Sequence, residues 1–168
     1  SYQSILERLT KNAVRMQLPI GSESDFAGLV DLLKMKAYYF EGKMGETLRE
    51  EEIPADMLEE AKKYRHELVE KIAGEDEALM NSYLEGKEIS IDDLRRVLRK
   101  ATIANTIVPV YTGSALKNKG VQLVLDAVVD YLPSPLDIPP VKGIDPRTGD
   151  EIFRHASDTD PFCALAFK

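Results

Sequence analysis

The residues best suited to bind a ligand form a short run of small and polar side chains at positions 112–120. This run follows an apolar segment, residues 107–111, and precedes a stretch with helical spacing. In open α/β sheets, ligands bind at the carboxyl ends of the strands, and a glycine such as Gly113 permits unusual dihedrals and close backbone approach. The tripeptide Ser114-Ala115-Leu116 therefore indicates a ligand-binding turn, although a plain strand-to-helix connection would use the same residues.

The other reactive side chains give little indication of chemistry. Cys163 alternates with Phe162 and Ala164, which predicts a small, buried residue in a strand and not a nucleophile. His66 has helical surroundings and is expected to be a surface or packing residue. His155 has only aspartates nearby, whereas zinc sites use more nitrogen and sulfur ligands. We therefore expect no catalytic residue and no metal ligand in this chain.

Composition limits the classes of protein to consider. The chain has 168 residues, of which 43% are hydrophobic and 30% charged, as in soluble globular domains. A single cysteine excludes an internal disulfide and favours a reducing, cytoplasmic setting. No apolar run reaches the roughly 18 residues that a membrane span requires. The net charge of −7 argues against a large nucleic-acid surface in this chain. Most of the acidic excess lies in residues 41–100, either as solvated helix faces or as a docking surface for a protein.

Hydrophobic spacing predicts the elements that position the turn. After a helix over residues 1–10, residues 14–20 alternate as a strand does, and residues 107–111 form a second strand, buried on both faces. We expect these two strands to lie side by side in a parallel sheet. The helix over residues 119–132 should turn five apolar side chains inward: Val121, Val124, Leu125, Val128 and Leu132.

The block between the two strands reads as an excursion from that sheet. Residues 28–40 are expected to be extended, and residues 47–53 to return as their partner strand after a turn. Three helices follow, the last opened by Ser90 in a near capping box. The helices are expected over residues 55–73, over residues 76–85 and from residue 90. After residue 132, we expect a linker over 137–150 and extended segments at 151–154 and 162–168.

These motifs together resemble elongation factor G, a translational GTPase. Residues 107–135, which contain Ser114-Ala115-Leu116-Lys117-Asn118-Lys119-Gly120, resemble the end of that family's GTP-binding domain. Residues 16–21 and 28–32 resemble the entry into its inserted subdomain, and residues 161–168 resemble the first strand of its β-barrel second domain. The resemblance covers essentially the whole chain and is strongest over residues 113–135.

The resemblance implies an α/β fold made of the carboxyl-terminal part of a P-loop GTPase domain, with parallel strands plus a helix. Four parts are implied: residues 1–20, the end of the GTPase core; residues 21–106, an inserted α+β subdomain; residues 107–140, the core strand, turn and helix; and residues 141–168, a linker and the start of the β-barrel.

A guanine-reading turn is the most specific implication of the resemblance. The Ala115 N–H would donate to guanine O6, Ser114 would shape the turn, and Leu116 would pack beside the base. Adenine carries a donor at that position, and an unpaired buried donor costs on the order of 1–3 kcal/mol. The complete protein would bind GTP or GDP with magnesium and use GTP hydrolysis on the ribosome to drive translocation, or, with ribosome recycling factor, disassembly.

This chain alone is expected neither to bind nor to hydrolyse GTP measurably. It contains no Gly-x-x-x-x-Gly-Lys-[Ser/Thr] loop to hold phosphates, and no Asp-x-x-Gly switch motif. The family's Asn-Lys-x-Asp motif is also absent and would lie upstream of Ser1.

The inserted block suggests a second reading, in which the chain is a protein-interaction module without enzymatic activity. In the family this block contacts the ribosomal stalk protein, with the helix over residues 55–73 as its main contact element. Five residues of that helix are candidates, each equally suited to a core or a solvated face: Tyr64, Arg65, Leu68, Lys71 and Ile72.

Overall fold

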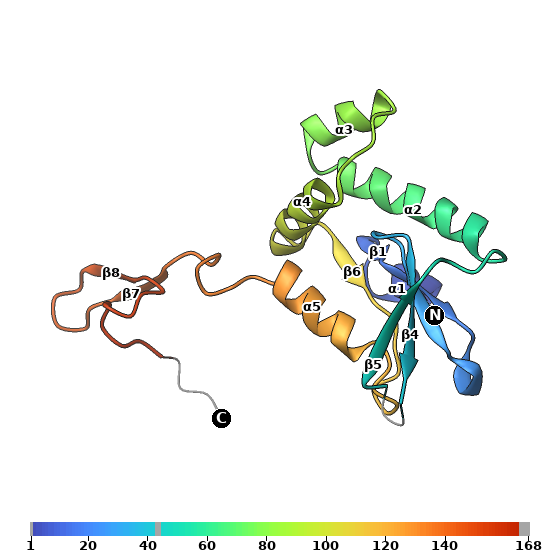
Figure 1. Ribbon diagram of the computed structural model, residues 1–168. Helices are drawn as coiled ribbons and strands as arrows, with labels where there is room; N and C mark the ends of the chain where they lie inside the picture. The colour runs from blue at the N-terminus through green and yellow to red at the C-terminus, as the bar shows by residue number, and fades with distance from the viewer. Residues whose placement is uncertain (1, 43–44, 165–168) are drawn as a thin grey trace. The chain divides into compact units, whose positions relative to one another are not determined.

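The computed structural model describes residues 2–42 and 45–164, which divide into two compact units between Leu132 and Pro133 (Figure 1). The fold is mixed α/β, with a small parallel sheet and antiparallel sheets. In the described residues, no helix is both long enough and apolar enough to cross a membrane.

The parallel sheet pairs two strands that are far apart in the sequence. Strand β1 (Ala13–Arg15) lies beside β6 (Val108–Val110), with Val14 opposite Pro109. The prediction that these segments are parallel neighbours is confirmed. The prediction that the second strand is buried on both faces is wrong, because β6 pairs only with β1 among the described strands and is half-buried.

The predicted strand over residues 14–20 is two strands that meet at Met16. The Met16 N–H donates to the Val110 carbonyl in the parallel sheet, at 3.0 Å, while its carbonyl accepts from the Leu32 N–H in the other sheet, also at 3.0 Å. Strand β2 (Gln17–Ile20) then joins the antiparallel sheet. The change of sheet overrides the simple alternation, so that Gln17 is buried and only 1% exposed.

The antiparallel sheet has the strand order β2-β3-β4-β5. Residues 28–40, expected to be one extended segment, form β3 (Gly28–Asp31), a turn, and β4 (Lys36–Glu41). The turn forms because the Asp31 carboxylate accepts from the N–H groups of Leu33 and Lys34, at 2.8 and 2.9 Å. The predicted return strand is confirmed as β5 (Thr47–Glu51), an edge strand exposed throughout.

Four helices of the first unit lie where the sequence predicts them. Helix α1 spans Tyr2–Arg8, α2 Leu58–Ala73, α3 Glu77–Leu84 and α4 Ile91–Ile103; a short 3-10 turn, η1, spans Glu23–Asp25. The Ser90 hydroxyl caps α4 by accepting from the Asp93 N–H at 3.1 Å. The main core forms where α2 and α4 pack on each other and on the strands, around Leu68, Ile72, Leu94 and Leu98.

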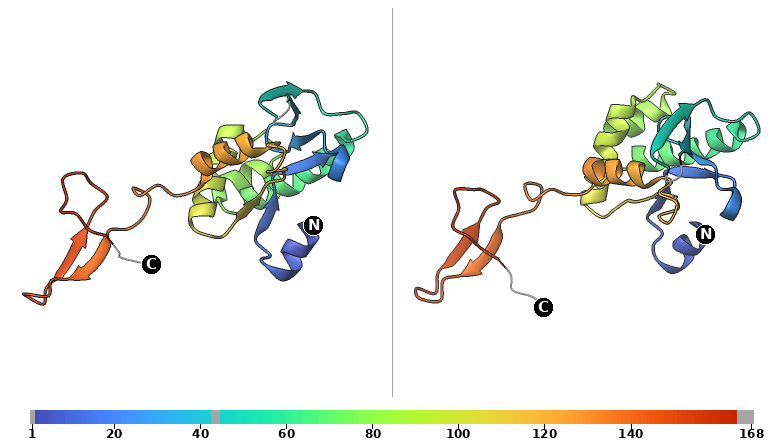
Figure 2. Two further views of the ribbon diagram at one scale, coloured as in Figure 1. Left: turned by 90° about the horizontal axis from the view of Figure 1, so that it is seen from below. Right: turned by 60° about the horizontal axis from the view of Figure 1, so that its bottom comes forward.

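Helix α5 (Val121–Tyr131) presents a different face to the core from the one predicted. Leu123 and Tyr131 are its buried residues, and Leu123 packs with Leu29, Tyr38 and Phe40 of the antiparallel sheet. The helix also lies beside α4 (Figure 2). The predicted inward residues are instead half-buried or exposed, with exposed fractions of 39% for Val124, 60% for Leu125, 45% for Val128 and 50% for Leu132; Val121 is half-buried.

The described part of the second unit contains one hairpin, formed by β7 (Val141–Ile144) and β8 (Glu151–Arg154). Strand β7 lies within the predicted linker, because its residues pair with the predicted extended segment at 151–154. Cys163 is exposed and outside any strand, so the prediction of a buried strand cysteine is wrong. Residues 162–164 form no strand, and the rest of the predicted barrel strand, residues 165–168, lies outside the described residues.

Candidate functional site

The predicted ligand-binding turn is a closed loop at the carboxyl end of β6. Ser114 and Lys119 pair antiparallel: the Ser114 N–H donates to the Lys119 carbonyl at 2.8 Å, and the Lys119 N–H returns to the Ser114 carbonyl at 3.0 Å. Inside this closure, the Lys117 N–H also donates to the Ser114 carbonyl, at 3.2 Å. Ser114, Ala115 and Leu116 therefore lie in one turn, as the sequence predicts.

Two glycines allow the two ends of the loop to come together. A Cβ atom on Gly113 would lie 2.7 Å from the Lys119 carbonyl oxygen, and one on Gly120 would lie 2.9 Å from the Thr112 carbonyl oxygen. Gly120 also has a φ of +88°, where other residues are strained, whereas Gly113 has no such backbone. Gly113 is therefore required for close approach, and the expected unusual dihedral belongs to Gly120.

The Ala115 amide has hydrogen-bonding capacity to spare. Within residues 2–42 and 45–164, no atom accepts a hydrogen bond from the Ala115 N–H. Ala115 is exposed, and the neighbouring Leu116 side chain is 90% exposed. The turn thus presents a free backbone donor next to an apolar side chain, which suits a planar ligand with a hydrogen-bond acceptor at its edge.

Side-chain contacts to other parts of the first unit hold the two ends of the turn, and the sequence analysis did not predict these contacts. The Thr112 N–H donates to the Gln17 side-chain oxygen at 3.1 Å. The Lys119 ammonium donates to the Phe26 carbonyl at 2.9 Å, and the Gln122 amide to the Gly45 carbonyl at 3.0 Å. The only sequence signal for these contacts is Gln17 itself, a polar residue within an apolar strand.

The five candidate stalk-contact residues of α2 mostly make internal contacts. Leu68 and Ile72 are 3% and 0% exposed in the core, so proposing them as partner contacts is wrong. The Arg65 guanidinium donates to the carbonyls of Leu32 and Leu33. Leu68 and Ile72 are buried because α2 packs its apolar stripe on the sheet.

Tyr64 and Lys71 join α2 to the amino-terminal part of the chain. The Tyr64 ring stacks under the Arg15 guanidinium, 3.8 Å from ring centroid to Cζ. The Lys71 ammonium donates to the Lys11 and Ala13 carbonyls at 3.3 Å each. The Tyr64 side chain is half-buried, whereas the Lys71 side chain is exposed.

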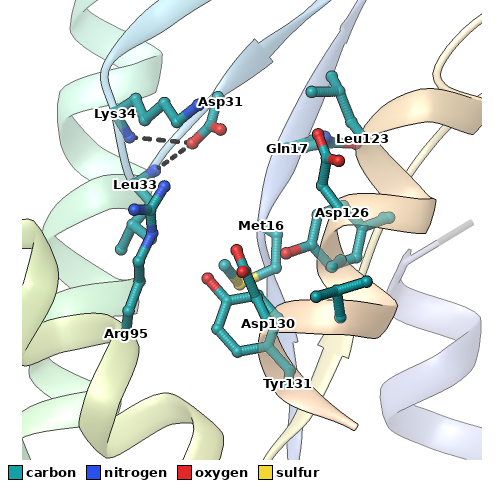
Figure 3. Close-up of a pocket in the computed structure, with 13 residues that line it drawn as sticks. Met16, Gln17, Asp31, Leu33, Lys34, Arg95, Leu123, Asp126, Asp130 and Tyr131 are labelled. Carbon is teal, nitrogen blue, oxygen red and sulfur yellow. Dashed lines mark hydrogen bonds between the residues drawn. The ribbon is translucent and has the colours of Figure 1, made fainter.

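A separate polar cavity of about 300 Å³ lies between the β3–β4 turn, α4 and α5 (Figure 3). Asp126 and Asp130, one helical turn apart on α5, lie at its exposed side, across from Asp31. The described residues contain no group of three or more His, Cys, Asp or Glu side chains arranged to hold a metal ion. The remaining lining residues include Met16, Gln17, Lys34, Arg95, Tyr111 and Tyr131.

Burial shifts the ionisation of the groups in this cavity. Desolvation raises the pKa of Asp31 above its ordinary value, and the Lys34 and Leu33 backbone donors oppose that rise. Burial raises the pKa of Tyr131 to about 12, and it raises the pKa of Tyr111 further, with an added contribution from Tyr131 itself. Both phenols therefore stay protonated at neutral pH and act as neutral hydrogen-bonding groups.

Comparison with known proteins supports the fold. No family model matches the chain. A crystal structure of a protein from Thermus thermophilus is similar to it, with 28% sequence identity and a TM-score of 0.69. The match covers 91% of this chain and 24% of that protein, so this chain spans about a quarter of the length of the protein it matches.

Proposed function

We propose that the chain is a segment of a translation elongation factor resembling elongation factor G. The complete protein uses GTP binding and hydrolysis to drive ribosomal translocation of tRNA and mRNA. One observation carries this proposal: the free Ala115 amide lies in a closed turn after a parallel strand, at the position of the family's last guanine motif. The similarity to the Thermus structure over 91% of this chain is compatible with the proposal that the chain is a segment of a longer protein.

Base recognition by this turn follows from simple donor and acceptor chemistry. The Ala115 N–H donates to guanine O6, Ser114 closes the turn through its backbone, and the exposed Leu116 side chain covers one side of the base. Adenine presents an amino group at that position, so the amide loses its acceptor and adenine binds more weakly, by about 1–3 kcal/mol.

The remainder of the proposed reaction requires parts outside this chain. Phosphate and magnesium ligands are proposed for the complete protein, together with the ribosome and ribosome recycling factor as partners and the cytoplasm as compartment. For this chain by itself we propose no GTP hydrolysis and no measurable GTP or GDP binding, because it contains neither a phosphate loop nor a switch motif.

Removing the Ala115 donor in the complete protein tests the proposal. Ala115 is the second residue of the turn closed by the Lys117-to-Ser114 hydrogen bond, a position that proline favours. Ala115→Pro should therefore keep the turn but weaken GDP binding about 10- to 100-fold, measured by calorimetry. Ala115→Ser retains the N–H and is the matched control. Equal GDP affinity for Ala115→Pro and the unchanged protein would contradict the proposal.

A second candidate function is a protein-interaction module that binds the ribosomal stalk protein without catalysis. A cavity of about 580 Å³ between α2 and α3 favours it, because it is lined by His66, Val69, Tyr83 and Ile89 and bordered by Leu84, which is 74% exposed. A pull-down of stalk protein by this chain should succeed, and Leu84→Asp should abolish it. Leu9→Asp, at a similarly exposed leucine in the turn after α1, is the control.

A further inference from the structure

The end of β6 is held by a buried glutamine. Gln17 is 1% exposed, and its side-chain oxygen accepts from the Thr112 N–H, the last amide before Gly113. Its side-chain nitrogen has no partner among the described residues. Burying an amide is unfavourable unless it is hydrogen-bonded, so the bond to Thr112 offsets part of that cost. This contact fixes where the strand ends and the turn begins.

The other end of the turn is held by Lys119. Its backbone closes the turn against Ser114 in both directions, and its ammonium group donates to the Phe26 carbonyl at 2.9 Å. Phe26 belongs to the connection between β2 and β3 and is itself buried. Lys119 therefore joins the closure of the turn directly to the antiparallel sheet.

The β4–β5 connection makes the third contact. The Gln122 side chain, in the first turn of α5, donates to the Gly45 carbonyl at 3.0 Å. Gly45 also lies against the backbone of the guanine-reading turn, since a Cβ atom there would be 2.9 Å from the Asn118 carbonyl oxygen and 3.2 Å from that of Lys117. Below these contacts, Leu123 packs on the sheet.

We propose that Gln17, Lys119 and Gln122 are positioning residues that tie the guanine-reading turn to one end of the antiparallel sheet. The inference rests on the proposed function, because it assumes that the Ala115 amide meets a guanine base. A donor must be held within about 0.5 Å of its productive position to be effective, and a preorganised turn loses little freedom on binding. The antiparallel sheet thus contributes to base affinity without touching the nucleotide.

Amide hydrogen exchange in this chain tests the tether without any nucleotide. Lys119→Met removes the ammonium donor and keeps the aliphatic stem. Exchange at the Ser114 and Lys119 amides should become about tenfold faster, while exchange in α4 stays unchanged. Lys119→Arg should restore slow exchange. Lys117→Met is the matched control, because Lys117 is an exposed lysine of the same turn whose ammonium contacts no described acceptor. Unchanged exchange in Lys119→Met would overturn the inference.

Nucleotide binding by the complete protein tests the consequence. Lys119→Met and Gln122→Leu should each weaken GDP binding about tenfold. Lys119→Arg should bind GDP with nearly the affinity of the unchanged protein. If the unchanged protein binds GDP and both variants bind it equally well, the positioning role is refuted and the proposed function stands. If the unchanged protein does not bind GDP, the proposed function fails, and with it the role of these residues in base binding.

Discussion

At the scale of single residues, Asp31 shows how one side chain serves local structure at an electrostatic cost. Its carboxylate accepts from two backbone N–H groups, those of Leu33 and Lys34, and so forms the turn between β3 and β4. Burial nevertheless raises its pKa above the ordinary value. A pKa raised on folding means that the folded chain favours the protonated form. Its stabilising contribution is therefore present below the ordinary pKa and is lost as the pH rises through the folded value.

Substituting Asp31 separates these two effects. Asp31→Asn keeps an oxygen acceptor and removes the half-buried charge, so we expect it to be at least as stable as the unchanged chain at pH 7. Its advantage should shrink as the pH falls toward 4. Asp31→Ala, which loses both hydrogen bonds, should be destabilised by about 1–3 kcal/mol at both pH values. Urea unfolding at pH 7 and pH 4 measures this, and an asparagine variant as unstable as the alanine variant would refute it.

The candidate site could be predicted from the sequence only where its residues are adjacent. Ser114, Ala115 and Leu116 are consecutive, and a strand-to-helix turn brings such residues together by local geometry alone. The contacts that hold the turn join residues far apart, since Lys119 and Phe26 are 93 positions apart and Thr112 and Gln17 are 95 apart. Spacing within a segment carries no information about pairs of this kind.

At the scale of elements, α5 shows the limit of hydrophobic periodicity. Apart from Gln122, Asp126 and Asp130, every residue of this helix is apolar. These three polar residues recur at every fourth position on one face, so periodicity predicts that the opposite face lies inward, although the other residues offer apolar surface in every remaining direction. The antiparallel sheet decides the orientation by packing against Leu123. Helix α4, with polar residues on one side, was predicted correctly: Leu94, Val97, Leu98 and Ala101 are all buried.

Two alanine substitutions on α5 test this orientation. Leu123 is 8% exposed and Val129 is 77% exposed. Leu123→Ala should lower the free energy of unfolding by about 2–4 kcal/mol, because it leaves a cavity against the sheet. Val129→Ala should change it by less than about 0.5 kcal/mol. Denaturant unfolding of both variants makes the comparison. Similar losses at the two positions would show that the helix is turned differently.

Strands were predicted less well than helices, for a physical reason. A helix closes its hydrogen bonds within about four residues, so its signals are local. A strand depends on a partner elsewhere, and the segments at 28–40 and 141–144 show the effect. The first was interpreted as one strand because the turn at Asp31 lies inside an apolar run. The second was interpreted as a linker because it is a strand only through its pairing with β8, which its own residues do not indicate.

At the scale of the whole molecule, the net charge limits the kinds of partner that this chain binds. The net charge of −7 and a sequence pI of about 5.0 make the chain strongly anionic at neutral pH. An anionic surface disfavours non-specific contact with nucleic acid. Under the proposed function, contacts with ribosomal RNA would therefore belong to other parts of the complete protein, and this chain would contribute a base-reading turn and a protein-binding surface.

Met16 joins the two sheets of the first unit directly, so the number of residues between their strands is fixed. Its N–H belongs to the parallel sheet and its carbonyl to the antiparallel sheet, with no residue between them. Side chains alternate along a strand, so inserting or deleting one residue here would turn every side chain of β1 or β2 to the opposite face. Lengthening the chain within residues 133–140, where no strand pairs, would carry no such penalty. The segment from Ala13 to Ile20 is therefore a part of the protein whose length is fixed.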